Sequence, residues 1–511
     1  MSALFLCTGL AGCGKTPPAP PAPPSDTDFN TEHPFVPDLS NVPAGVTKLG
    51  LQSFVNAAGQ QQFELYGKEF HNIGVDYYSL FVGCFTNKYN VANSLAAMQQ
   101  LASYGVKAVR FAAAPVDYSV AAMSNSSWKY YTMNKAAYYG AMDQIVHKAE
   151  SLNIGLVPSF FWGDWNLCNL FDEPWRMSLN DASSQTWKFR KKYLDEFVGR
   201  YAGSPALYMW EYGNEQADLY DLPQYYNKPA EFNQGYPLPP GSSRTARTQA
   251  DDYVTYQDLS DSYSIFTQVI DEADSSQRAV ATGDTIIRTY AYNAMTNHDY
   301  DADTFDQYDQ MVNMLTPKLT DDPASNMFTT SSHMYTNWDP NAGADNTPGR
   351  WDNFSYSGIN LFGVTTFAGG TGDLSGWDSW NSYYKFWMAM GAQQGKAPYI
   401  GECGAMYGWA TADNHPNAST ETDPALNYAV LCDQVMIQAA VDENFPLLLL
   451  WNYEKGATPT AGDYSDHSNG TEWSFNVENF PKGPGIMAAV KAANQTFVDN
   501  GIGGAPFDTA A

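Results

Sequence analysis

The chain has little positive charge, few cysteines and no long apolar run. It carries 27 basic against 55 acidic residues, a formal net charge of −28 over 511 residues. Nucleic-acid binding needs a basic surface, so this balance argues against a nucleic-acid partner. The six cysteines include no CxxC pair and are sparse, which argues against a structural zinc site and against a disulfide scaffold. No apolar run reaches the roughly 18 residues that a membrane-spanning helix needs.

Aromatic residues are abundant instead. They make up 15% of the chain, with 14 Trp and 34 Tyr. Such rings pack well against apolar C–H faces, so this loading suits wide aromatic binding surfaces as well as a core. The 44% hydrophobic content over 511 residues is enough for one large core.

Two motifs overlap at the start of the chain. Residues Gly9–Thr16 match the phosphate-binding pattern GxxxxGKT, and Leu10–Cys13 resembles a bacterial lipobox. A phosphate-binding loop must open a helix, but a proline-rich run begins at Pro17 and argues against nucleotide binding. We therefore expect a signal or lipobox segment over 1–13, lipidated at Cys13, and a Pro-rich tether over 14–45. This places the protein on the outer surface of a bacterial cell, with a secreted protein carrying an ordinary signal peptide as the alternative.

Strand-like and helix-like segments alternate from residue 46 to residue 505. The expected strands are 71–77, 106–111, 154–161, 206–210, 279–282, 327–335, 399–401 and 447–451. Apolar residues at helical spacing follow most of them, and a small hairpin over 63–70 precedes them. Eight such units predict one α/β domain over 46–505, a (β/α)8 barrel whose long polar loops, 216–255 and 337–377, follow strand ends.

Two glutamates stand at the ends of expected strands. Glu215 follows Asn214 after the fourth strand, and Glu402 lies in Gly401-Glu402-Cys403-Gly404 at the seventh. Both would lie at the carboxyl-terminal mouth of the barrel, where catalytic groups gather. Hydrolysis of a glycosidic bond needs two such carboxyl groups, one protonated and one ionised.

On these residues, the chain from about 60 to 500 resembles glycoside hydrolase family 5, a family of the clan A barrels. The match at Asn214-Glu215 is complete, whereas Cys403 stands where the family commonly has an aromatic residue. The resemblance implies a retaining endo-β-glycanase that acts on a polysaccharide or oligosaccharide, β-1,4-mannan or β-1,4-glucan, without a cofactor. Glu215 would be the acid/base and Glu402 the nucleophile.

The resemblance also implies substrate-site roles for Arg110, Asn214, His333, Tyr335 and Trp451. Arg110 would orient the nucleophile and favour its ionised form through charge-assisted hydrogen bonds. Tyr335 would hydrogen-bond the nucleophile, and His333 would line the subsite. Asn214 would contact the 2-hydroxyl of the sugar, and Trp451 would stack on the sugar at the cleavage point.

The third strand departs from the family pattern. Many members have a His near its end, whereas this chain is rich in aromatic residues there and has Trp162. That composition is nearer to the mannanase-type branches, and it makes Trp162 a candidate substrate-binding residue. Trp165, Trp338 and Trp409 are further subsite candidates, and core packing is the alternative for each of them as it is for Trp162.

Other features have a structural interpretation. Glu211 lies on the same side of its strand as Glu215, so we expect it to be a structural partner of the site. Asp299, Asp301 and Asp303 resemble a calcium loop, but they lack its later Gly and Glu, and no metal site is expected. The sequence leaves open whether the cysteines that follow strands one and three, Cys84 and Cys168, form a disulfide. It also leaves open the oligomeric state and a second function, a non-catalytic glycan-binding surface lipoprotein on the same barrel.

Overall fold

The structure is a computed structural model. It describes residues 29–86, 89–116, 126–162, 164–216, 242–245, 252, 254–284, 328–329, 331–336, 380–405, 424–456, 475–478 and 482–503.

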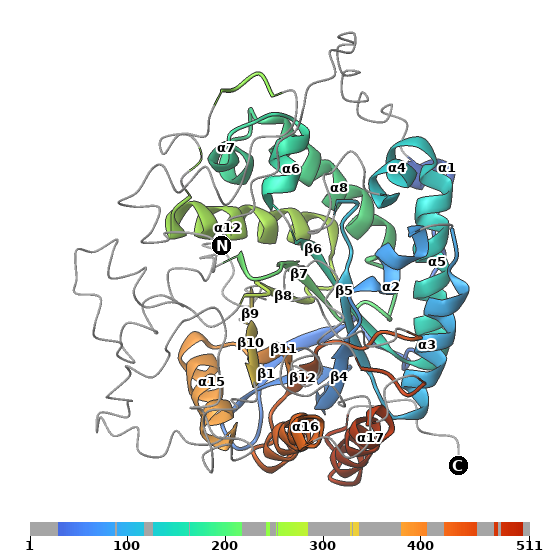
Figure 1. Ribbon diagram of the computed structural model, residues 1–511, viewed down its shortest axis with the longest axis vertical. Coiled ribbons are helices and arrows are strands. Elements are labelled where there is room, and N and C mark those ends of the chain that lie inside the picture. Colours follow the sequence, from blue (N-terminus) through green and yellow to red (C-terminus); the bar gives the residue numbers. More distant parts are fainter. Residues whose placement is uncertain are drawn as a thin grey trace, which may run out of the picture.

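A parallel sheet curls around the centre of the molecule (Figure 1). Its strands are β4 (Asn72–Asp76), β5 (Ala108–Ala112), β6 (Gly155–Phe161), β7 (Met209–Gly213), β8 (Ala279–Ala281), β9 (Phe328–Thr329), β10 (Ser331–Thr336), β11 (Tyr399–Ala405) and β12 (Leu447–Leu450). They pair in the order β10-β11-β12-β4-β5-β6-β7-β8-β9. Only residue 330 separates β9 from β10, so the two ends of this order meet in one stretch of chain. The arrangement fits the predicted (β/α)8 barrel.

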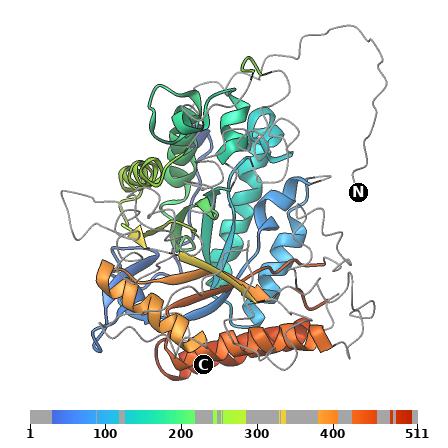
Figure 2. The ribbon, with the colours of Figure 1, turned by 60° about the vertical axis from the view of Figure 1, so that its left-hand side comes forward.

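Helices surround the sheet and alternate with its strands along the chain (Figure 1). The main ones are α3 (Ala92–Ser103), α5 (Lys135–Leu152), α8 (Gln185–Tyr201), α12 (Tyr256–Ala273), α15 (Trp380–Gln394), α16 (Pro424–Asp442) and α17 (Gly483–Asp499). Shorter helices are α1 (Phe29–Glu32), α2 (Ser79–Val82), η1 (Gly83–Phe85), α4 (Ser126–Met133), α6 (Asp164–Leu170) and α7 (Trp175–Asn180). Figure 2 shows α15, α16 and α17 next to one another on the outside of the barrel. The predicted alternation is confirmed for these segments.

Local sequence sets the ends of several helices. The side chain of Asn134 accepts a hydrogen bond from the backbone N–H of Ala137 at the start of α5, and Ser184 caps α8 in the same way. At the start of α12, Thr255 and Asp258 form a reciprocal capping box. These caps satisfy N–H groups that would otherwise lack partners, so each helix begins where the sequence supplies a cap.

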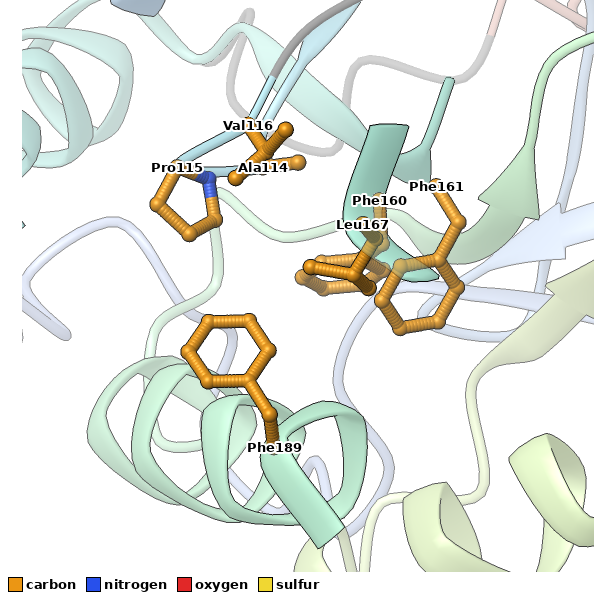
Figure 3. Close-up of a pocket in the computed structure, with 7 residues that line it drawn as sticks. All are labelled: Ala114, Pro115, Val116, Phe160, Phe161, Leu167 and Phe189. Carbon is orange, nitrogen blue, oxygen red and sulfur yellow. The ribbon is translucent and has the colours of Figure 1, made fainter. Parts of the chain in front are cut away.

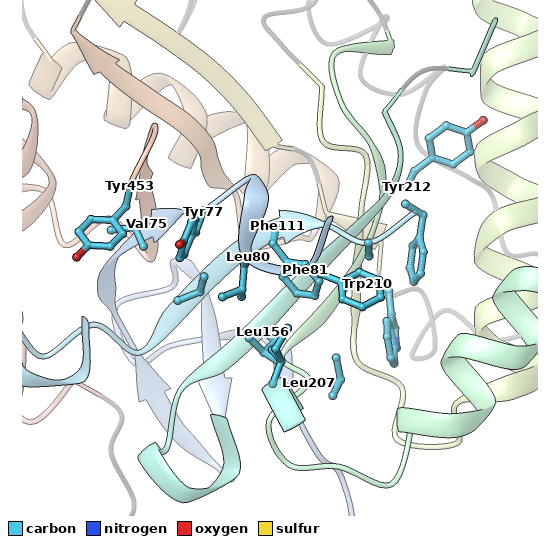
Figure 4. Close-up of a cluster of buried hydrophobic side chains, with 14 of the residues drawn as sticks. Val75, Tyr77, Leu80, Phe81, Phe111, Leu156, Leu207, Trp210, Tyr212 and Tyr453 are labelled. Carbon is cyan, nitrogen blue, oxygen red and sulfur yellow. The ribbon is translucent and has the colours of Figure 1, made fainter. Parts of the chain in front are cut away.

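The barrel strands are buried on both faces. Apolar residues of β4, β5, β6 and β7, namely Val75, Phe111, Leu156 and Trp210, belong to one buried cluster that also contains Phe81 of α2 (Figure 4). Because successive side chains on a strand point to opposite faces, the residues next to these point toward the barrel axis. Polar residues at those positions therefore converge at the centre.

A small antiparallel sheet packs against one end of the barrel. It contains β1 (Leu51–Val55), β2 (Gln61–Leu65) and β3 (Lys68–Phe70), and its last two strands form the hairpin that the sequence predicts. The turn between them has positive φ at Tyr66 and Gly67. Apolar residues of this sheet join one buried cluster with residues near the amino ends of the barrel strands, such as Ala108 and Leu447. The hairpin thus closes the end of the barrel opposite the predicted site.

Residues from 29 onward, which fall within the predicted tether of 14–45, pack on the barrel helices. The ring of Phe29 stacks on Tyr139 with centroids 5.3 Å apart. Arg200 Nη1 donates to the carbonyl oxygen of His33 over 2.6 Å. These contacts anchor part of the predicted tether, so the folded unit begins at or before residue 29. Cys13 and the rest of 1–28 lie outside the described residues.

Three described cysteines, Cys84, Cys168 and Cys403, are buried. No disulfide joins Cys84 and Cys168 in this structure. Burial raises the pKa of the Cys84 thiol to about 11, so it is protonated at neutral pH. No helix in the described part of the chain is long and apolar enough to span a membrane. The described ranges also contain no group of three or more His, Cys, Asp or Glu residues suited to hold a metal ion, and the acidic stretch 299–303 lies outside them.

Candidate active site

Polar residues from four strands meet at the carboxyl-terminal half of the barrel. Asp76 is the last residue of β4, Arg110 lies in β5, Glu211 in β7 and Glu402 in β11. Trp451 directly follows β12. Because all of these strands are parallel, their carboxyl ends lie at one end of the sheet, as the sequence predicts for a barrel.

Arg110 is the centre of this group. Its Nη1 lies 2.5 Å from Asp76 Oδ2 and 2.5 Å from Glu402 Oε1. Its Nε donates to both carboxylate oxygens of Glu211, over 2.8 and 2.9 Å, and its Nη2 donates to Asn214 Oδ1 over 2.8 Å. The guanidinium is therefore held on all sides, and it fixes the orientation of every carboxyl group that it contacts.

Burial and charge act against each other at this site. Burial alone lowers the pKa of Arg110, but attraction to Glu211, Asp76 and Glu402 outweighs it and raises that pKa well above its usual value. Burial raises the pKa of Asp76 well above its usual range, and repulsion from Glu402 and Glu211 adds to this effect, while Arg110 opposes it. The site thus keeps its cation and disfavours a full set of anions.

Glu211 has a structural partner besides Arg110. The hydroxyl of Tyr399, at the start of β11, donates to Glu211 Oε2. Glu211 is fully buried, and its contact with Arg110 ties β7 to β5. Sequence reasoning expected a structural role for Glu211, but it missed both Tyr399 and Asp76. A charged residue at the end of an otherwise apolar run, as at Asp76, is the signal that could have revealed the latter.

The backbone at Glu215 adopts a left-handed conformation, with φ of 52°. Its N–H donates over 2.9 Å to the carbonyl oxygen of Gly283, which follows β8 and has φ of 74°. A Cβ at Gly283 would overlap the carbonyl oxygen of Gly213, so only glycine allows the ends of β7 and β8 to approach this closely. Gln216 Nε2 also donates to the carbonyl oxygen of Phe161 over 2.7 Å. These contacts hold the expected acid/base residue on a fixed turn.

The two candidate catalytic carboxyl groups lie in different surroundings. Glu402 is 2% exposed and bonded to Arg110, whereas Glu215 is half-buried. A neighbouring cation favours the ionised form of a carboxyl group, whereas a more exposed carboxyl group can exchange protons with water. In the strand register, His333 lies beside Glu402 and Tyr335 beside Gly404. The side chains of His333 and Tyr335 lie outside the described residues.

Aromatic side chains form one wall next to Arg110. The rings of Trp162 and Trp451 stack with centroids 5.9 Å apart, and Tyr78 packs edge-on against Trp162 at 4.8 Å. The guanidinium of Arg110 lies 4.8 Å from the centre of the Trp162 ring. Trp162 is 4% exposed, and its Nε1 has no hydrogen-bond partner among the described residues. The structure therefore brings Trp162 and Trp451 together, as a platform that touches the charged group.

The other tryptophan candidates have no described side chains. Trp165 lies in α6 with its side chain outside the described residues, and Trp338 and Trp409 lie outside them altogether.

A small apolar pocket lies beyond the ends of β5 and β6 (Figure 3). It has no ionisable residue in its lining, so it offers no group for catalysis. The lining residues are Ala114, Pro115, Val116, Phe160, Phe161, Leu167 and Phe189.

Comparisons with known proteins identify relatives of the same fold. No family model matches the chain. A probable mannan endo-1,4-beta-mannosidase A-2 from Aspergillus terreus is 33% identical over 79 residues, which are 14% of this chain and 20% of that protein. The chain therefore matches about a fifth of the length of this curated relative.

Solved structures match over much more of the chain. The endo-1,4-beta-mannanase from Rhizomucor miehei is 14% identical with a TM-score of 0.51, and the match covers 88% of this chain and 99% of that one. A glycoside hydrolase family 5 mannosidase from Rhizomucor miehei is 12% identical with a TM-score of 0.54, over 89% and 99% of the two chains. At these identities the likeness concerns the fold, so the chain shares the fold of these two structures.

Proposed function

We propose that the protein is a retaining endo-β-glycanase that hydrolyses a β-1,4-linked polysaccharide, with mannan as the first candidate and glucan as the second. The observation that carries the proposal is the buried pair of Glu402 and Arg110 next to the half-exposed Glu215 at one end of the barrel. Two carboxyl groups in different surroundings are what the reaction requires. The curated relative and the solved structures named above are mannanases or mannosidases, which favours mannan.

In the first step, Glu402 attacks the anomeric carbon and Glu215 protonates the leaving oxygen. In the second step, Glu215 takes a proton from water, and the water hydrolyses the bond between the sugar and Glu402. Arg110 Nη1, 2.5 Å from Glu402 Oε1, keeps the attacking carboxylate ionised and oriented.

Neighbouring groups would bind the sugar. Asn214 Oδ1 accepts from Arg110, which leaves the amide Nδ2 to donate to the 2-hydroxyl of the sugar. The half-buried face of Trp451 would pack against the C–H face of the sugar ring. The indole N–H of Trp162 is a donor that a sugar hydroxyl can satisfy.

The test is release of reducing sugar from a panel of β-mannans, β-glucans, xylans and galactans. We expect activity on mannan that Glu402→Gln abolishes, and that Glu215→Gln reduces by about 10²- to 10⁴-fold, the usual contribution of a general acid. Glu272→Gln, on the exposed face of α12, is the matched control and should retain wild-type activity. Oligosaccharide binding without product from any polymer would contradict the proposal, and it would favour the glycan-binding lipoprotein.

A further inference from the structure

The barrel centre holds one guanidinium against three carboxyl groups. Arg110, Asp76 and Glu211 are fully buried, and Glu402 is 2% exposed. Among the residues that the structure describes, no second Lys or Arg forms a salt bridge with any of these carboxyl groups. Three ionised carboxylates around this guanidinium would repel one another at buried positions, which is strongly unfavourable. A proton on one of these carboxyl groups relieves that repulsion.

The hydrogen bonds indicate which one. Glu211 accepts from Arg110 Nε on both oxygens and from the Tyr399 hydroxyl on Oε2, so each of its carboxylate oxygens has a donor. Asp76 accepts only on Oδ2, from Arg110 Nη1. Its buried Oδ1 has no hydrogen-bond partner among the described residues. An anionic oxygen without a donor is costly in such a place, and a neutral carboxylic acid avoids that cost.

The surroundings of Asp76 supply no second positive charge. Arg110 faces it from β5, and the carboxyl groups of Glu211 and Glu402 face it from β7 and β11. On the β12 side, the backbone N–H of Tyr453 donates to the carbonyl oxygen of Asp76, not to its carboxyl group. Burial and the two carboxylates accordingly raise the pKa of Asp76.

We propose that Asp76 is a positioning residue that remains a neutral acid while Glu402 is ionised, so that Nη1 of Arg110 is shared between the two without a second cation. An ionised Asp76 would compete with Glu402 for the same Nη1 and draw the guanidinium away from it. The role of Asp76 toward a nucleophile rests on the proposed function, whereas its protonation does not.

Asp274 provides a matched control. Its Oδ2 also lies 2.5 Å from an arginine Nη1, that of Arg278, and it is 1% exposed. Unlike Asp76, it faces one arginine in a one-to-one pair, and it accepts further bonds from Trp210 Nε1 and the backbone N–H of Ser276. It is therefore a buried aspartate whose two carboxylate oxygens both have donors, unlike those of Asp76.

The first experiment is infrared spectroscopy of the wild-type protein with aspartate selectively labelled with carbon-13, at about pH 6, where ordinary Asp and Glu side chains are ionised. We expect a C=O stretching band of a protonated carboxylic acid that shifts with the label. It should disappear in Asp76→Asn and persist in Asp274→Asn. Absence of a labelled band from the wild type would overturn the proposal even if Asp76→Asn fails to fold.

The second experiment measures the unfolding equilibrium as a function of pH. A raised pKa in the folded state means that folding binds a proton above the unfolded pKa of about 3.9. Wild-type stability should therefore fall relative to Asp76→Asn as pH rises from about 4 to the folded pKa, by about tenfold in the unfolding constant per pH unit. Asp274→Asn should be less stable than the wild type at pH 6 to 8. A constant gap between wild type and Asp76→Asn would contradict a neutral Asp76.

The third experiment connects Asp76 to Glu402. The acidic limb of the kcat/KM profile on mannan reports the ionisation of the free enzyme's essential base. Because Asn replaces one neutral group by another, the limb of Asp76→Asn should stay at its wild-type pH, whereas a shift of about one unit or more to lower pH would indicate an ionised Asp76. If no glycan is hydrolysed, the proposed function fails, while the infrared and unfolding results still decide the protonation of Asp76.

Discussion

Replacing Arg110 by Met tests how the barrel centre is held together. The change keeps an apolar side chain of similar length but removes the cation that faces Asp76, Glu211 and Glu402. Removing one partner of a buried ion pair typically costs about 3–5 kcal/mol, because the remaining charge is left uncompensated. We expect the free energy of unfolding at pH 7 to fall by at least this amount.

The loss should depend on pH with a definite sign. Asp76 already holds a proton in the wild type, so the proton that the variant binds at higher pH goes to one of the other two carboxyl groups that lose the cation, Glu211 or Glu402. One additional bound proton changes the free energy of unfolding by about 1.4 kcal/mol per pH unit. The deficit of Arg110→Met should therefore shrink by about 2.7 kcal/mol between pH 7 and pH 5 if one proton is taken up over that range.

The assay is urea denaturation followed by tryptophan fluorescence at pH 5, 6, 7 and 8. Arg278→Met is the control, because Arg278 is equally buried but its guanidinium faces one carboxylate, Asp274, and otherwise backbone carbonyl groups. That variant should be destabilised with a weaker pH dependence. A deficit for Arg110→Met below about 1 kcal/mol, or one that is constant from pH 5 to pH 8, would refute a network of buried carboxyl groups that depends on this cation.

Two further substitutions test the support of the site. Gly283→Ala should destabilise the protein by about 1–3 kcal/mol and reduce kcat, because its Cβ would overlap the carbonyl oxygen of Gly213 at a positive φ. Thermal unfolding measures the first effect and reducing-sugar release the second, and wild-type values for both would contradict the close approach. Tyr399→Phe should lower the free energy of unfolding at pH 7 by about 1.5–3 kcal/mol, because it removes a hydroxyl that donates to the buried carboxylate of Glu211. A change below about 0.5 kcal/mol in urea denaturation would show that the hydroxyl contributes little.

The sequence by itself determined the elements of the barrel. A run such as Leu447–Leu450 is apolar throughout and short, which predicts a buried strand, and helical spacing of apolar residues predicts the helices between strands. These patterns are local, so they can be recognised without knowing which other segments pack against them. They also placed Glu402 and Glu215 at strand ends, whereas Arg110 was identified through the resemblance to glycoside hydrolase family 5.

Local patterns could not show which distant residues meet. Phe29 packs on a helix more than a hundred residues away, a contact that no local pattern around Phe29 indicates. Whether Cys84 pairs with Cys168 was undecided in the sequence, since a disulfide depends on the distance and direction of two side chains. In the structure both cysteines are buried and no disulfide joins them.

Only the tertiary structure decided the composition of the site. Asp76 lies beside Arg110 because β4 and β5 are neighbours in register, and Glu211 reaches the same guanidinium from β7. Tyr399 joins through β11, nearly two hundred residues from the carboxylate that it contacts. Closing the sheet brings these four side chains together, and the shared burial then decides which carboxyl groups are ionised. No stretch of sequence contains that information, because the energy of a buried charge depends on every charge around it.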